Sequence, residues 1–447
     1  MARVVVVGGG FGGMAAAARL AKLGHEVTLA EASARLGGAL GLVEQDGFLW
    51  DAGPTSTLLP AVVRDLFRKS GRPLERELDL VAVEPVQQHR FEDGTVLDLP
   101  AGSRGQQQAA VAQALGPEKR GRRAGRHGSR APAQEWVDYV HGFAPVWDAL
   151  RRDWLERPWS AEHAGKEARD LLATRASLHK YVHRLLRDER LRKVASYRAV
   201  LDGQDPRNVP AWFGMWSYVE QNFGAWTVPG GMGLLAGALE ERLATRRVTV
   251  LRSTPVRDLV VSGNRVVGVR TDSDDLDAEV VVCAVDPRRL PALAAHVART
   301  MPAIPPVVCH LGIVGEVPDL PHEVVLHGDP MIVLRTNGTA PAGGHAWTLL
   351  GRGRLAEDMV TTLQRQGIRV RDQVEVRRDR SPRELVQEWG GSPLGVLWQG
   401  RGTLAQRMGT RAPVDGVYLA GAHTTPGAGL PSVGLSAALV AQLVGPA

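Results

Sequence analysis

The chain has 447 residues, enough for two or three domains and a large buried core. Its 44% hydrophobic and 23% charged residues exclude a disordered or collagen-like chain. The net charge of +6 lies largely in residues 118–130, a glycine-rich run without aromatic side chains. We interpret this run as a solvated loop and leave contact with phospholipid open. We expect no nucleic-acid binding, because no aromatic side chains for base stacking are interleaved with the cations.

The cysteines and histidines give no metal or disulfide pattern. Cys283 and Cys309 are far apart and lack a CxxC spacing, as expected for a reducing cytoplasm. His179 and His183 share a helix face, but no third ligand lies nearby, so we expect no metal site. The sequence lacks an uninterrupted apolar stretch of about 18 residues, which excludes a spanning helix. We therefore expect a cytoplasmic protein, with peripheral membrane attachment left open.

A dinucleotide-binding unit is predicted at the N-terminus. Residues 4–7 are valines, which are typical of a strand buried on both faces of a parallel sheet. In the GxGxxG pattern that follows, Gly8 makes the tight turn, Gly10 admits a pyrophosphate, and Gly13 lets the helix pack closely. Residues 14–23 predict that helix, whose N-terminal N–H groups and dipole favour the pyrophosphate.

The next residues favour FAD over NAD. Residues 26–30 predict a second strand, and Glu31 at its end can accept hydrogen bonds from the adenosine ribose while repelling a 2′-phosphate. Arg35, Gly37 and Gly38 can approach the pyrophosphate from its second side, although an ordinary glycine turn also accounts for them. A second GxGxxG unit after a later strand is missing. We therefore expect no nicotinamide domain.

Later segments predict further parts of this domain. Residues 248–261 predict a strand that continues through a hairpin into residues 265–270. Residues 279–286 and 417–420 predict buried strands, and residues 435–444 predict an apolar helix.

The start of this last helix is a candidate flavin contact. Pro431 is tolerated in a first turn, and the N–H groups at Ser432 and Val433 could point at the flavin and stabilise its anionic reduced form. A plain terminal helix is the alternative.

Four segments resemble the phytoene desaturase-like branch of the flavin amine oxidase superfamily. They are the N-terminal unit through Gly38, the Asp-Ala-Gly-Pro-Thr stretch at residues 51–55, the glycine-rich stretch at residues 226–233, and the C-terminal stretch at residues 416–433. The resemblance is weakest from about residue 100 to 205. It implies non-covalently bound FAD, with Val256 near the adenine and Ala284 close to the cofactor.

The residue pattern and the resemblance together predict one set of cofactor-binding residues. They are Gly8, Gly10, Phe11, Gly12, Gly13, Glu31, Ala32, Arg35, Gly37, Gly38, Ala39, Gly53, Pro54, Thr55, Val256, Ala284, Gly421, Ala422, Leu430, Pro431, Ser432 and Val433. The chain departs from the pattern at Ala422, where many relatives have an aspartate that holds the ribitol. The ribitol-binding group therefore stays open.

We predict an α/β fold with a second, α+β domain. A Rossmann-type FAD-binding domain is assembled from the discontinuous segments 1–80, 225–300 and 405–447. A substrate domain with a mixed or antiparallel sheet comes from residues 81–133 and 301–404, because alternating strands are predicted at 85–91, 96–99, 307–315, 323–327, 331–336 and 346–350. Residues 134–224 predict a helical cap, a candidate membrane-facing region.

Aromatic residues indicate a substrate wall. The candidates are Trp212, Phe213, Trp216, Tyr218 and Trp226, which could line a channel to the flavin, although core packing also accounts for them. Trp136, Tyr139, Trp147, Trp154 and Trp159 could likewise cap a tunnel, contact lipid headgroups or form a helical core.

Two residues are candidates for moving a proton. Glu220 is the one acid in the aromatic run, and His423 lies beside the C-terminal loop. A solvated Glu220 and a structural His423 are the alternatives.

The resemblance implies hydride removal from a C–H bond of an apolar polyene or isoprenoid, with desaturation. Few ionisable residues are expected in the channel, since the flavin does the difficult step. A first alternative is an FAD-dependent oxidase or dehydrogenase of a smaller amine, alcohol or polyketide intermediate. A second is a flavoprotein without turnover. The oligomeric state is open.

Overall fold

The computed structural model describes residues 1–116, 131–355 and 357–447. The basic run at residues 118–130 lies outside the described residues.

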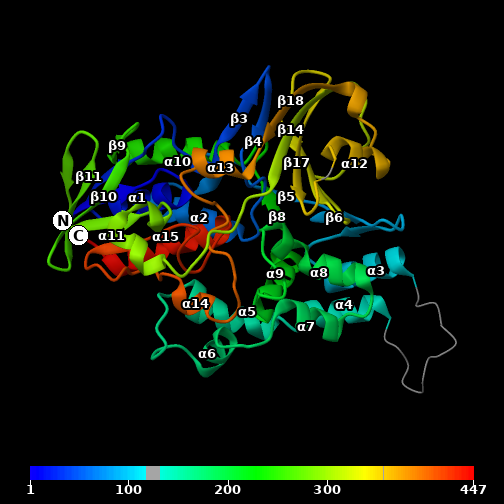
Figure 1. Cartoon of the computed structure of the whole chain (residues 1–447), viewed down its shortest axis with the longest axis horizontal. Helices are drawn as coiled ribbons and strands as arrows, with labels where there is room; N and C mark the ends of the chain where they lie inside the picture. Colours follow the sequence, from blue (N-terminus) through cyan, green and yellow to red (C-terminus); the bar gives the residue numbers. More distant parts are fainter. Residues whose placement is uncertain (117–130, 356) are drawn as a thin grey trace.

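A five-stranded parallel sheet forms the first half of the molecule, at the end where both termini lie (Figure 1). Apolar side chains bury both faces of its first strand, as the run of valines predicts. In spatial order the strands are β19 (Val417–Leu419), β13 (Val280–Cys283), β1 (Arg3–Val7), β2 (Glu26–Ala30) and β9 (Thr249–Leu251). The three segments assigned to the FAD-binding domain supply these strands, and the domain borders themselves stay predictions.

Helices cover one face of this sheet and a second sheet covers the other. The helices are α1 (Phe11–Lys22), α2 (Pro60–Ser70), α10 (Leu234–Thr245) and α15 (Leu430–Val444). The antiparallel second sheet contains β10 (Val256–Ser262), β11 (Arg265–Thr271) and β12 (Asp275–Asp277), with α11 (Pro291–Ala294) packed beside it. Helix α1 begins directly after Gly10, earlier than predicted, and α15 begins directly after Gly429, so that Pro431 lies in its first turn as expected.

The prediction of one strand over residues 248–261 is wrong. The segment is divided between β9 of the parallel sheet and β10 of the antiparallel sheet. Ser253 has a positive φ of 50° and Pro255 lacks an N–H group, so the chain cannot continue as one strand.

The second half contains a mixed seven-stranded sheet. Its spatial order is β18 (Val374–Arg380), β14 (Val307–Val314), β17 (Gly344–Arg352), β16 (Met331–Gly338), β15 (Glu323–Leu326), β6 (Gln87–Arg90) and β7 (Val96–Leu99). The β15–β6 pairing is parallel and the others are antiparallel. The sequence predicted six of these strands and missed β18. Shorter elements around it are the pair β3 (Leu42–Gln45) and β4 (Phe48–Asp51), the pair β5 (Val81–Val83) and β8 (Ala225–Thr227), and the helices α12 (Met359–Arg365), α13 (Pro382–Glu388) and α14 (Thr403–Gln406).

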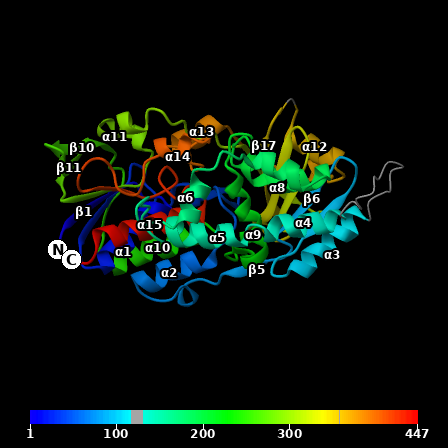
Figure 2. The same ribbon diagram turned by 90° about the horizontal axis from the view of Figure 1, so that it is seen from below.

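A helical cap lies below this sheet in Figure 1, and the view from below shows it extending toward α15 (Figure 2). Its helices are α3 (Arg104–Leu115), α4 (Pro132–His141), α5 (Ala144–Leu150), α6 (Lys166–Leu172), α7 (Leu178–Leu185), α8 (Glu189–Leu201) and α9 (Met215–Phe223). Trp136, Tyr139, Trp147 and Trp154 are buried in it, which supports the helical-core alternative for the first three, whereas Trp154 also lines the cavity described below. Trp159 is exposed.

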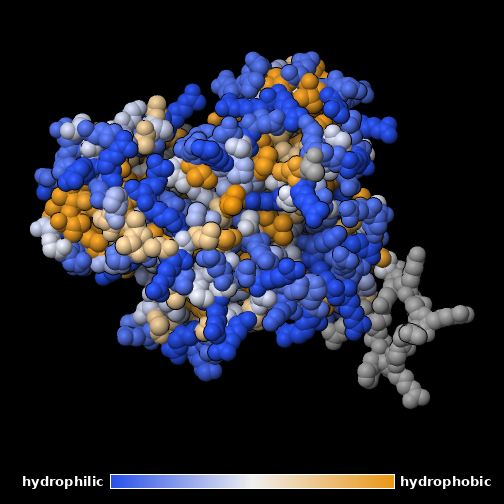
Figure 3. All heavy atoms as spheres, viewed as in Figure 1, coloured by the Kyte–Doolittle hydropathy of each residue, from blue (hydrophilic) through white to orange (hydrophobic). Residues whose placement is uncertain are grey.

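The visible surface is largely hydrophilic (Figure 3). Apolar residues gather at the end where β10 and β11 lie, and Val261 and Val267 are exposed there. Within the described ranges, no helix is long and apolar enough to cross a membrane.

Candidate active site

One large cavity is lined by residues from both halves of the molecule and from the helical cap. Part of its wall is glycine-rich backbone at the ends of β1 and β2, and another part is aromatic and ionisable.

Steric crowding explains the glycines at the first turn. A Cβ on Gly8, whose φ is +100°, would lie 2.6 Å from Val285 Cγ1, and one on Gly13 would lie 1.9 Å from the Gly8 carbonyl oxygen. Gly10 precedes α1, whose first turn carries no side-chain cap from any described residue. Its N-terminal N–H groups are therefore free to bind an anion.

A second glycine loop is held against the first. The Gly37 N–H donates to the Gly9 carbonyl at 2.9 Å, and Gly37 and Gly38 both have positive φ. The two loops thus approach one site from two sides. Arg35 is exposed and lies outside the cavity wall, and its contact with the pyrophosphate stays a prediction.

Glu31 lines the cavity beside these two glycine loops. Its carboxylate accepts hydrogen bonds from Gly9 N at 2.6 Å and Ser33 N at 2.8 Å. Its carbonyl accepts from Thr254 N at 2.8 Å, which places the segment before Val256 beside it. A carboxylate already held at the end of β2 is suited to accept ribose hydroxyls.

The start of α15 meets the start of α1. A Cβ on Gly12 would lie 3.1 Å from Gly421 Cα, and Gly421 N donates to Ser436 Oγ at 2.8 Å. Two helix N-termini therefore point toward one part of the cavity.

Most predicted cofactor residues line this cavity: Gly8, Gly10, Phe11, Gly12, Glu31, Gly37, Gly38, Ala39, Gly53, Pro54, Thr55, Ala284, Gly421, Ala422, Leu430, Pro431, Ser432 and Val433. Gly13, Ala32, Arg35 and Val256 do not. Gly13 supports packing, Ala32 is exposed, and Val256 pairs with Thr271 in β10.

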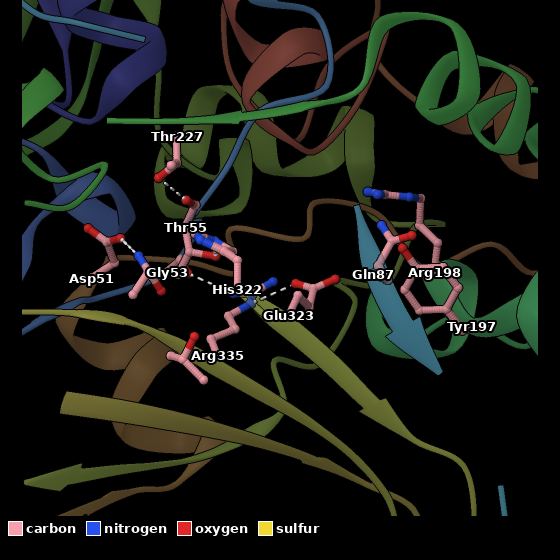
Figure 4. A network of polar contacts seen from close by, with 12 residues as sticks. Asp51, Gly53, Thr55, Gln87, Tyr197, Arg198, Thr227, His322, Glu323 and Arg335 are labelled. Carbon is pink, nitrogen blue, oxygen red and sulfur yellow. Dashed lines mark hydrogen bonds and ion pairs between the residues drawn. The ribbon is translucent and has the colours of Figure 1, made fainter. Parts of the chain in front are cut away.

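The segment at residues 51–55 is fixed from both halves of the molecule (Figure 4). The Asp51 carboxylate accepts from Gly233 N at 2.8 Å and Asn337 Nδ2 at 2.9 Å, and burial raises its pKa despite these bonds. The Gly53 carbonyl accepts from Arg335 Nη1 at 3.0 Å, and the Thr55 carbonyl from the hydroxyl of Thr227 at 2.8 Å.

An aromatic wall is present, and three of its five predicted members belong to it. Trp212, Phe213 and Trp216 line the cavity together with Trp154, Trp389 and Trp398. The Trp212 ring contacts the edges of Trp154 and Trp398, with centroid separations of 5.0 and 5.7 Å. These edge-to-face contacts hold the wall rigid.

Tyr218 and Trp226 do not line the cavity. Tyr218 packs against the core of the helical cap. The indole of Trp226 donates to Phe223 O at 2.6 Å and lies under the Arg64 guanidinium. Tyr218 lies in α9, only one face of which can point at the cavity, whereas Trp226 lies beyond this helix in strand β8.

Glu220 is neither solvated nor in the large cavity. Its carboxylate is paired with Arg198 and accepts from Gln87 Nε2 at 3.1 Å and Tyr197 OH at 2.9 Å. All of these contacts reach Oε1, through which Glu220 positions neighbouring side chains, and its role in moving a proton stays a prediction.

The expectation of few ionisable residues in the cavity is wrong. We call the aromatic and ionisable part of the cavity its substrate part. Polar residues that line it are Gln87, Tyr197, Arg198, Asp202, His322, Glu323 and Arg335. Arg335 bonds Glu323 Oε2 at 2.9 Å, and His322 Nε2 lies 3.3 Å from Thr55 Oγ1 (Figure 4). Burial lowers the pKa of His322 to about 4. Because these residues are scattered over three sequence regions, only the pairing of strands brings them together.

His423 lies in the loop before α15, and Arg407 contacts the backbone of the same loop. Burial lowers the pKa of His423, while the Asp286 carboxylate, 3.8 Å from Nε2, acts in the opposite direction. Arg407 Nη2 donates to the carbonyls of Ala422 at 3.0 Å and Thr424 at 3.1 Å. Its guanidinium has no carboxylate partner among the described residues, and burial lowers its pKa to about 10. Sequence reasoning missed this cation.

His179 and His183 stack, with ring centroids 3.9 Å apart. Among the residues placed by the structure, no group of three or more potential ligands could hold a metal ion.

Comparison with known proteins adds three findings. The family described as flavin containing amine oxidoreductase matches residues 11–445. The 4,4'-diapolycopene oxygenase of Methylomonas sp is 26% identical over 98% of this chain and 97% of its own length. The phytoene dehydrogenase of Streptomyces griseus is 28% identical over 99% of this chain and 94% of its own length.

The fold also matches a solved structure. An oxidoreductase from Methanosarcina mazei superposes with a TM-score of 0.68 at 16% identity, covering 98% of this chain and 100% of that one. This likeness confirms the predicted fold class.

Proposed function

This chain belongs to the family of flavin containing amine oxidoreductases, and on that premise we propose that it is an FAD-dependent desaturase of an extended apolar polyene or isoprenoid. The observation that carries the proposal is the one large cavity described above, in which a glycine-lined part continues into a tryptophan-lined part. A long cofactor and a long apolar substrate can meet in such a cavity.

The residues present fit FAD. Two bare glycine loops, the free N-terminus of α1 and the Glu31 carboxylate suit a pyrophosphate with an adenosine ribose. Arg407 supports the loop carbonyls at the position where relatives carry a ribitol-binding aspartate. We propose non-covalent binding, since neither Cys283 nor Cys309 lines the cavity.

When bound, FAD supplies an acceptor for the hydride removed from the substrate C–H bond. The tryptophan wall holds the apolar chain and excludes water from it. The fixed segment at residues 51–55 prevents movement of the wall near the reacting carbon.

The neutral imidazole of His423 is our candidate acceptor of the neighbouring proton. Its lowered pKa keeps the ring unprotonated at neutral pH. The Asp286 carboxylate would stabilise the imidazolium that forms.

A peripheral membrane contact belongs to the proposal. Met301 and Ile304 are 51% and 63% exposed, and the following Pro305 and Pro306 line the cavity. An apolar substrate could pass from lipid to the cavity beside them.

The ionisable residues of the substrate part favour one second candidate, oxidation of a smaller amine, alcohol or polyketide intermediate. Anaerobic flavin bleaching separates the two. We expect phytoene to bleach the flavin absorbance and small amines to leave it unchanged. Bleaching by small polar compounds alone would establish the second candidate instead.

A further inference from the structure

Asp202 lies in the wall of the substrate part of the cavity. It follows the last residue of α8, and its backbone N–H donates to Arg198 O at 2.9 Å. Its carboxylate makes no hydrogen bond or ion pair with any residue that the structure describes. A partly buried carboxylate therefore faces the cavity with its oxygens open.

The position is unfavourable for folding. A negative charge at a helix C-terminus opposes the helix dipole. Burial raises the pKa of Asp202 to about 6, even though arginines nearby act in the opposite direction. An acidic residue at this position therefore does not stabilise the fold. Ionisable groups with a shifted pKa concentrate at binding and catalytic sites.

The charges around Asp202 indicate which partner it takes. Asp202 and the charged residues around it form a set of three arginines and three carboxylates. The members are Arg198, Arg335, Arg352, Asp202, Glu220 and Glu323. Arg198 is paired with Glu220 and Arg335 with Glu323, whereas Arg352 donates to backbone carbonyls of Leu201 and Pro305. The set is formally neutral. A substrate ammonium or carboxylate would leave an uncompensated charge in the cavity.

A neutral hydrogen-bond donor fits this arrangement. A carboxylate only accepts hydrogen bonds, so a ketone or ester oxygen gives it no partner. A plain hydrocarbon would remove water from the Asp202 oxygens without any replacement. A hydroxyl group donates to the carboxylate and adds no charge.

We propose that the substrate carries a hydroxyl group that donates a hydrogen bond to Asp202, so that the enzyme acts on a hydroxylated polyene or isoprenoid in preference to the parent hydrocarbon. The inference rests on the proposed desaturation and narrows its substrate class.

The test uses two ligands, a linear carotene and its monohydroxy derivative of equal length and unsaturation. Both are titrated into the flavoprotein, reduced so that it cannot turn over, with tryptophan fluorescence as the readout. The oxidised enzyme then gives kcat/KM for each. We expect the wild type to favour the alcohol by at least about 10-fold in Kd, the effect of one hydrogen bond to a charged group.

Two variants and one control assign the preference to Asp202. Asp202→Leu should reduce the ratio to about 1, and Asp202→Asn, which keeps the shape and part of the hydrogen bonding, should give an intermediate ratio. Asp205→Asn should keep the wild-type ratio, since Asp205 is exposed, does not line the cavity, and uses its carboxylate to accept a hydrogen bond from Arg207 N at 2.9 Å.

Equal affinities of the wild type for the two ligands would overturn the inference, and so would an affinity ratio that neither Asp202 variant changes. In both cases the proposed desaturation would still stand. If neither compound is desaturated but the alcohol binds in an Asp202-dependent way, the site is supported and the proposed reaction fails. Should Asp202→Leu not retain flavin, Asp202→Asn decides alone.

Discussion

Contacts between single atoms determine how closely α1 packs against the end of β1. The Gly8 carbonyl oxygen would lie 1.9 Å from a Cβ on Gly13, and this oxygen belongs to the backbone, which cannot rotate away. The sequence pattern predicts this close approach of helix and strand. It does not predict Arg407 or Asp202, because each has its role only through elements that lie far apart in the sequence.

Gly13→Ala should therefore separate α1 from β1. We expect a loss of about 1–3 kcal/mol in stability, as for an overpacked core, and at least a 10-fold fall in FAD retained through purification. Gly237→Ala is the control, since its Cβ would meet nothing within 4 Å in α10. That variant should keep its FAD and gain stability. Normal FAD content in Gly13→Ala would contradict the packing argument.

The raised pKa of Asp202 makes stability depend on pH. Its folded-state pKa of about 6 exceeds the ordinary aspartate value, so the unfolded chain ionises more easily. The free energy of unfolding then falls as pH rises through the interval from about 4 to 6. Asp202→Asn removes this ionisation and should be more stable than the wild type by about 1–2 kcal/mol at pH 8, since partial exposure reduces the full effect.

Thermal unfolding at pH 5 and pH 8 measures this prediction. The advantage of Asp202→Asn should be larger at pH 8 than at pH 5. An equal difference at both values would show that Asp202 is not desolvated.

At the scale of elements, the pattern of apolar residues predicted the buried strands of the seven-stranded sheet but missed one strand at its edge. Strand β18 has the sequence Val-Glu-Val-Arg-Arg-Asp-Arg and lies at one edge of its sheet. Charged residues suit an exposed edge strand, so no alternation marks it. The break between β9 and β10 was also missed, because the Ser253 conformation depends on the Ser253 N–H bond to Ser33 O at 3.0 Å.

Ser253→Gly should stabilise the protein at the turn between β9 and β10. Ser253 has a φ of 50°, which glycine adopts without strain, and we expect a gain of up to about 1 kcal/mol. The control is Ser262→Gly, the same change in the exposed end of β10, which should be destabilising. Tm values from calorimetry provide the comparison. A fall in Tm for Ser253→Gly would show that the turn is not strained.

At the scale of the whole molecule, two halves close one cavity. The segment at residues 51–55 joins them, because Asp51 accepts from Gly233 N directly before α10 and Gly53 accepts from Arg335 of the seven-stranded sheet. The family resemblance predicted the cofactor end from glycine patterns. The substrate end could not be predicted in the same way, since its polar residues converge only after strand pairing.

The central claim is that this cavity carries out FAD-dependent desaturation. The most direct measurement is the mass of the product after anaerobic single turnover of the flavin-loaded protein with a polyene. We predict a loss of two hydrogens for each flavin reduced. An unchanged substrate mass with the flavin still oxidised would contradict the account.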